Sequence, residues 1–260
     1  MTGIVLDGVT VRLGGRPVVD RVSATVEAGE WVALIGPNGA GKTSLLRAIA
    51  GLLPCEGSVA LGGRPAASLD RRERARQLAV VPQEPETPPW LTVAEYVLLG
   101  RTPHLGPLAR EGGSDREAAW RALERLDLEP FVDRPLGTLS GGERQRTVVA
   151  RALAQEAPIV LLDEPTAALD IGHQQQALEL LDALRASEGL TLLAAMHDLT
   201  LAAQYADRVL LLAAGRIVAD GSPAAVLTEA ALAEHYGASV RVTTVDDRIA
   251  VLPTRRQLVT

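Results

Sequence analysis

The sequence predicts an α/β fold with a parallel-sheet core, an N-terminal antiparallel β region and an inserted helical subdomain. Short apolar runs at residues 30–35, 159–162 and 190–196 have the length of buried strands. A helical pattern separates the last two runs, and a strand–helix–strand order is typical of parallel strands. Helical periodicity also fills residues 93–154. We therefore expect a parallel sheet that is interrupted by a helical insertion at about residues 90–154.

The first part of the chain has the pattern of an antiparallel sheet. Apolar and polar positions alternate between residues 4 and 35, around a turn at Gly14-Gly15. Further strands are expected at residues 58–61 and 78–81, with an arginine-rich helical segment between them. The alternating region leads directly into the first buried strand of the core.

Helix starts in the second part are marked by capping boxes. Ser114 with Glu117, and Ser140 with Glu143, have the spacing in which a hydroxyl and a carboxylate satisfy the free amides of a helix N-terminus. A further helix is expected from about residue 171 to residue 188. The sequence therefore predicts at least two capped helices in the insertion and one between the last two core strands.

After Gly215 we expect a short strand, then two small helices at residues 223–227 and 229–236. A terminal hairpin is expected to turn at two aspartates near residue 246. These patterns suggest a main domain over residues 1–237 and a hairpin and tail over residues 238–260.

Composition limits the class of protein. The chain has 260 residues, 47% hydrophobic and 22% charged, which is ordinary for a soluble protein. The net charge of −6 argues against nucleic acid as a partner. No apolar run approaches the ~20 residues that span a bilayer, and the N-terminus lacks signal-peptide features. The single cysteine, Cys55, agrees with a reducing compartment. We expect a cytosolic protein.

The glycine-rich loop after the first core strand is a phosphate-binding loop. Lys42 is the only lysine in the chain, and it stands at the end of this loop, where a compact ammonium suits a crowded phosphate pocket. The loop amides, the helix N-terminus and Lys42 would hold a nucleoside triphosphate, and the Thr43 hydroxyl would bind Mg²⁺. An accidental glycine-rich turn is the alternative, which the flanking strand and helix disfavour. The expected nucleotide-binding residues are Gly36, Pro37, Asn38, Gly39, Ala40, Gly41, Lys42, Thr43 and Ser44.

Polar side chains follow three other strands at the point where each strand ends. Asp163 and Glu164 follow residues 159–162, His197 follows residues 190–196, and Gln83 follows residues 78–81. In open parallel sheets, ligands bind at this carboxyl edge. We expect Asp163 to hold Mg²⁺ and Glu164 to polarise the attacking water. His197 is expected at the γ-phosphate, and Gln83 at Mg²⁺ or the water.

Ser140, Gly141, Gly142 and Glu143 form a second helix N-terminus that phosphate can approach. An ordinary capped helix start is the structural alternative. Two such ends in one small domain exceed what one triphosphate needs, unless another chain contributes to the site.

The motifs in their order resemble the ATP-binding subunits of ABC transporters. They are residues 36–43, Gln83, residues 139–145, residues 159–164, Ala168-Leu169-Asp170 and His197.

This resemblance implies a head-to-tail homodimer that holds two ATP molecules, each between the phosphate loop of one subunit and residues 139–145 of the other. It also implies that Gln83 lies in a loop that senses a membrane permease, that Asp170 lies at the dimer interface and that His197 is a switch histidine. A permease would hold the chain at the cytoplasmic face of the membrane, and an extracytoplasmic binding protein would be an indirect partner.

Residues 99–104, 197–202 and 220–237 are similar to importer subunits for iron-siderophore, haem and cobalamin. The family usually has an aromatic residue near Leu13 that stacks on adenine, and Glu143 replaces the commoner glutamine. Two alternatives stay open: a soluble ABC ATPase of iron–sulfur assembly or DNA repair, and a P-loop kinase. The kinase alternative leaves residues 139–145 unexplained.

Overall fold

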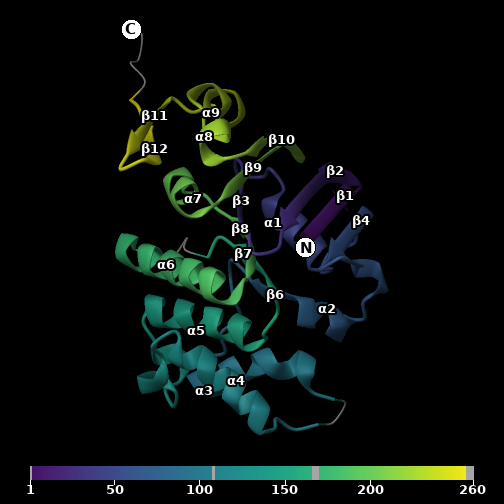
Figure 1. Cartoon of the computed structure of the whole chain (residues 1–260), viewed down its shortest axis with the longest axis vertical. Helices are drawn as coiled ribbons and strands as arrows, with labels where there is room; N and C mark the ends of the chain where they lie inside the picture. Colours follow the sequence, from purple (N-terminus) through teal and green to yellow (C-terminus); the bar gives the residue numbers. More distant parts are fainter. Residues whose placement is uncertain (1, 107–108, 166–169, 256–260) are drawn as a thin grey trace.

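The computed structural model describes residues 2–106, 109–165 and 170–255. Its core is a six-stranded sheet, whose strands lie in the middle of the molecule in Figure 1. The strand order is β10-β9-β3-β8-β7-β6, and the pairs from β9 to β6 are all parallel. Only β10, at one edge, runs antiparallel to its neighbour. The strands are β3 (Trp31–Ile35), β6 (Leu78–Val81), β7 (Ile159–Asp163), β8 (Thr191–Ala195), β9 (Arg208–Ala213) and β10 (Arg216–Gly221).

Both faces of this sheet are covered, which explains why its strands are continuously apolar. In β3, Trp31, Ala33 and Ile35 pack into one core cluster, while Val32 and Leu34 pack into the other. The same alternation holds along β7 and β8. Polar residues can therefore appear only where the strands end, and this confines the chemistry of the sheet to its edge.

The N-terminal antiparallel region is confirmed as a separate four-stranded sheet of order β2-β1-β4-β5. It packs through the second core cluster against α1 (Lys42–Ile49), which follows the phosphate-binding loop. Its strands are β1 (Thr2–Leu13), β2 (Arg16–Glu27), β4 (Glu56–Leu61) and β5 (Arg64–Pro65). The helix α2 (Arg71–Gln77) then leads into β6.

The helical insertion contains α3 (Val93–Leu98), a 3₁₀ helix (Leu99–His104), α4 (Gly113–Glu124) and α5 (Gly141–Ala154). Short 3₁₀ turns at Glu129–Phe131 and Leu136–Thr138 connect α4 to α5. Figure 1 places α3 and α4 at the end of the molecule away from the C-terminal hairpin.

The prediction that Ser114 caps α4 is wrong. The helix begins two residues earlier, with Gly112 as its N-cap, because the Asp115 carboxylate accepts a hydrogen bond from the Gly112 amide at 3.0 Å and takes the role expected of Glu117. The capping box of Ser140 and Glu143 is present as predicted.

The C-terminal part returns to the core. It comprises α6 (Ile171–Glu188), α7 (Leu199–Tyr205), α8 (Pro223–Val226), α9 (Glu229–Tyr236) and the hairpin β11 (Val240–Val245) with β12 (Arg248–Pro253). The hairpin packs on α7, where the Thr200 hydroxyl accepts the Val251 amide at 3.0 Å. No helix within the described ranges is both long and apolar enough to cross a membrane. The division at residues 237 and 238 stays a prediction.

Candidate functional site

The phosphate-binding loop joins β3 to α1 and lines a cavity of about 270 Å³. Gly36 and Gly41 cannot carry a side chain, because a Cβ would lie 2.1 Å from the Leu212 carbonyl oxygen and 2.4 Å from that of Val18. Both also have positive φ, which favours glycine. The cavity is lined by Val18, Asn38, Gly39, Ala40, Gly41, Lys42, Thr43, Ser44, Glu164 and His197.

Lys42 is the first residue of α1 and is only 5% exposed. Its Nζ donates to the Gly36 carbonyl at 2.7 Å and contacts that of Pro37 at 3.4 Å. Burial lowers the pKa of Lys42, while the nearby carboxylates of Glu164 and Asp163 raise it in part. An anionic ligand would supply negative charge that compensates this buried ammonium.

Thr43 and Asp163 bring two hard oxygen donors together, where the start of α1 meets the end of β7. The Thr43 hydroxyl donates to Asp163 Oδ1 at 3.1 Å. Burial raises the pKa of Asp163, and the negative charge of the neighbouring Glu164 raises it further. The protein alone therefore provides too little positive charge to balance the Asp163 carboxylate. One hydroxyl and one carboxylate, with phosphate oxygens and water, make a donor set that suits Mg²⁺. The residues present therefore fit this ion.

The Glu164 side chain, at the end of β7, contacts side chains that follow the ends of β6 and β8. Its Oε2 accepts a hydrogen bond from Gln83 Nε2 at 2.6 Å, and its Oε1 pairs with His197 Nε2. Its side chain is 9% exposed, against 42% for His197. A φ of +53° turns the backbone away from β7, and the Glu164 amide donates to Ala195. The expected gathering of Gln83, Glu164 and His197 at one sheet edge is therefore present.

The second predicted phosphate-binding segment lies elsewhere in the same chain. Ser140 is the N-cap of α5, and its amide donates to Glu143 Oε2 at 2.7 Å. This contact is the main cause of the lowered pKa of Glu143. Asp170 is the N-cap of α6. In the described structure, neither residues 140–143 nor Asp170 line the cavity at the phosphate-binding loop. Ala168 and Leu169 lie outside the described residues.

Two residues near these segments were not singled out from the sequence. Val18 on β2 lines the cavity, and only its strand position could have suggested it. His173 lies on α6 against Gly142, thirty-one positions away in the sequence, and no local pattern predicts this contact.

A phosphate-binding loop between a core strand and a helix, with carboxylates at the adjoining strand end, defines a P-loop nucleoside triphosphatase. A family model described as ABC transporter matches residues 19–167, which is more than half of the chain. The chain belongs to the ABC transporter family, and it is one of the ATP-hydrolysing subunits.

Two curated relatives show how far this similarity extends. The hemin import ATP-binding protein of Streptomyces coelicolor is 47% identical over 90% of this chain and 83% of its own length. The ferric enterobactin transport ATP-binding protein of Escherichia coli is 39% identical over 94% of this chain and 90% of its own length.

Solved structures agree with these relatives. A chain of an ABC transporter described as metal-chelate type, in an inward-facing conformation, matches with a TM-score of 0.85 and 25% identity, and the match covers 98% of this chain and 99% of that one. A bacterial ABC transporter cassette solved as a dimer matches with a TM-score of 0.75 and 31% identity, over 85% of this chain and 98% of that one.

Proposed function

We propose that this chain drives a membrane importer, and that Glu164 is its catalytic base. The single observation that carries the proposal is the position of the Glu164 carboxylate, beside the phosphate-binding loop and between Gln83 and His197. Glu164 accepts a proton from the attacking water, Gln83 orients that water, and His197 donates to the γ-phosphate.

The binding residues follow from the same geometry. The backbone amides of residues 36–44 and the side chain of Lys42 hold the ATP phosphates. Thr43 and Asp163 would hold Mg²⁺, and Gln83 is a further candidate ligand. The bound ion would neutralise charge at the phosphates. Val18 lines the cavity and would offer aliphatic surface to the base, whereas Leu13, near which the family usually has an aromatic ring, does not line it.

A homodimer completes the site. Ser140, Gly141, Gly142 and Glu143 do not line the cavity of their own chain, so they serve the nucleotide of a partner chain. The likeness to a cassette solved as a dimer supports this arrangement. Asp170 lies next to the same surface, because its neighbour His173 contacts Gly142.

The permease partner has a suitable docking surface in a groove of about 610 Å³ between α1, α2 and α5. Arg71, Arg74 and Arg151 line it, and Leu52 stands beside them with 62% of its surface exposed. A groove lined by three arginines and an exposed leucine fits a permease segment that carries carboxylates next to an apolar side chain. This charge pattern favours an acidic permease loop as the occupant.

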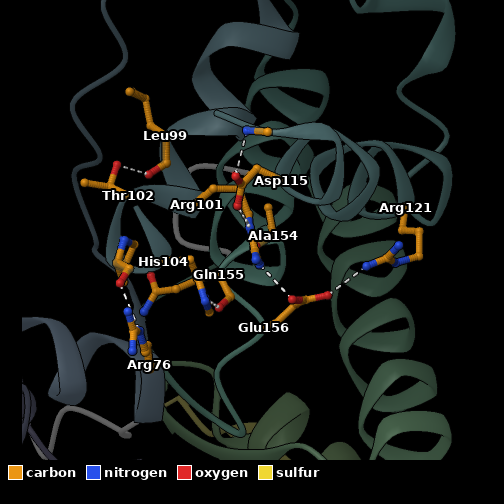
Figure 2. Close-up of polar contacts among 12 residues, drawn as sticks. Arg76, Leu99, Arg101, Thr102, His104, Asp115, Arg121, Ala154, Gln155 and Glu156 are labelled. Atoms are coloured by element: carbon orange, nitrogen blue, oxygen red, sulfur yellow. Dashed lines mark hydrogen bonds and ion pairs between the residues drawn. The ribbon is translucent and has the colours of Figure 1, made fainter. Parts of the chain in front are cut away.

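The groove is joined to both the core and the insertion. Gln155, which lines it, donates to the Leu78 carbonyl at 2.9 Å, at the start of the strand that ends near Gln83. His104 Nε2 lies 2.9 Å from the Gln155 carbonyl, and Arg76 donates to Pro103 at 2.9 Å (Figure 2). A partner seated in the groove would therefore contact the structure that positions Gln83.

The cargo is a metal chelate of the hemin or iron-siderophore class, and cobalamin belongs to the same range. The named relatives import hemin or transport ferric enterobactin, and the structural neighbour is of the metal-chelate type. An extracytoplasmic binding protein would deliver the cargo, and the chain would sit at the cytoplasmic face through its permease. Nothing favours the iron–sulfur assembly alternative over this.

The experiment is affinity purification of the tagged chain from detergent-solubilised membranes, followed by uptake of labelled hemin or ferric siderophore in a deletion strain. We expect an apolar membrane protein to copurify, and uptake to be lost without the chain. A paired charge reversal, Arg71→Glu with Arg151→Glu, should release the permease while ATP binding by the purified chain is kept. Purification without any membrane protein, with unchanged uptake, would refute the importer assignment.

A further inference from the structure

The imidazole of His173 lies directly over Gly142, at the N-terminal end of α5. A Cβ added to Gly142 would meet His173 Cδ2 at 2.6 Å and Nε2 at 3.0 Å. The ring is held from the other side, because Nδ1 lies 2.7 Å from Asp170 Oδ1, which also accepts the His173 amide at 2.9 Å. The ring is therefore clamped between the N-cap of α6 and the second glycine of the segment at residues 140–143.

A second contact joins the same two parts of the chain. Gln145 Nε2, one turn further along α5, donates to the Pro165 carbonyl at 2.5 Å. Pro165 directly follows Glu164, and Asp170 precedes α6. The start of α5 is thus fastened to the chain on both sides of residues 166–169: at Pro165 through Gln145, and at Asp170 through His173.

We propose that His173 is a positioning residue that fixes the Ser140–Gly142 surface and Asp170 as one unit, which the chain presents to the nucleotide of its partner. The inference rests on the proposed two-chain site. It assigns the requirement for glycine at position 142 to His173: a larger residue would displace the His173 ring and break its contact with Asp170.

Neighbouring Gly141 provides a matched comparison. A Cβ on Gly141 would meet nothing within 4 Å, so the tight space belongs to Gly142 alone. Both glycines lie in the first turn of α5 with ordinary helical backbone, since neither has a positive φ. Their different surroundings, rather than their backbone, distinguish them.

The test is a double-mutant cycle with Gly142→Ala and His173→Ala, made in the Glu164→Gln background so that ATP-bound dimers accumulate. Dimer dissociation constants are measured by light scattering, and affinity for a fluorescent ATP analogue is measured on dilute monomers. We expect each single substitution to weaken the dimer about tenfold, with monomer affinity unchanged, and the double variant to be no weaker than His173→Ala. His173→Asn, which keeps a nitrogen at the position of Nδ1 but lacks the ring, should tolerate Gly142→Ala.

Additive losses in the cycle would overturn the inference, because Gly142 would then be required for a reason other than His173. Unchanged dimerisation in His173→Ala would overturn it as well. Failure of the Glu164→Gln parent to dimerise with ATP would refute the two-chain function itself. In that case the proposed positioning role of His173 is refuted too. The Glu164→Gln parent, measured without the other substitutions, distinguishes this outcome from additive losses and from unchanged dimerisation in His173→Ala.

Discussion

Replacing Glu164 with glutamine separates ATP binding from hydrolysis. Glutamine has nearly the same shape as glutamate. It keeps one oxygen and carries an NH₂ group in place of the other, at the positions that face Gln83 and His197. Gln83 Nε2 now lies 2.6 Å from Glu164 Oε2, and a flipped Gln83 amide can pair with either end of the introduced side-chain amide. The variant should therefore fold normally and keep the phosphate-binding loop intact.

The expected loss is that of a general base. Removing a positioned base costs about 10²- to 10⁴-fold in rate. At about 1.4 kcal/mol for each factor of ten, this raises the barrier by roughly 3 to 6 kcal/mol. Binding should be affected much less, because Glu164 repels the phosphates and Lys42 remains in place. Loss of the Glu164 charge also removes one of the causes that raise the pKa of Asp163, which favours Mg²⁺ binding.

The assay combines steady-state phosphate release with equilibrium binding of a fluorescent ATP analogue. We expect turnover to fall at least a hundredfold, with nucleotide affinity equal to or greater than that of the wild type. Gln83→Glu is the matched comparison, because it places a carboxylate on the other side of the same hydrogen bond without replacing the base. Phosphate release by Glu164→Gln at the wild-type rate would refute the assignment of the base.

Two further predictions concern buried charges. The pKa of Asp163 is raised above 3.8 in the folded protein, so the nucleotide-free chain loses stability as the pH rises through this raised pKa. Asp163→Asn should therefore raise the Tm at neutral pH, and this gain should shrink as the pH falls toward 3.8. Equal Tm values for the variant and the wild type across this pH range would contradict the prediction. Arg101 is buried and pairs with Asp115 at 3.2 Å and Glu156 at 2.7 Å (Figure 2). Arg101→Met should cost about 3 kcal/mol in urea unfolding, because it strands the Asp115 carboxylate, and adding Asp115→Asn should recover part of the loss.

The edge of the parallel sheet could be predicted because it depends on few facts. Glu164, His197 and Gln83 each follow a short apolar run, and parallel strands place such residues on one edge whatever the strand order. The prediction did not require knowing that β6 lies beside β7. The phosphate-binding loop was predictable for a similar reason, since its amides and its helix are consecutive in the chain.

Other features depended on information that local patterns lack. β9 (Arg208–Ala213) was not predicted, because its apolar run follows α7 with no glycine or proline between them, and periodicity alone cannot tell such a run from further helix. Gly112 rather than Ser114 is the N-cap of α4, because the Asp115 carboxylate accepts a hydrogen bond from the Gly112 amide and is also held by Arg101. The clamp of His173 on Gly142 joins two helix starts that meet only in the folded chain.

The Lys42 ammonium, enclosed by the Gly36 and Pro37 carbonyls, is also the sole side-chain primary amine of the molecule. An amine-directed reagent thus has one internal target, and that target lies in the phosphate cavity. The rate of its modification would report occupancy of the cavity directly, without any engineered label. Shielding by bound triphosphate could be followed by intact mass, one adduct at a time.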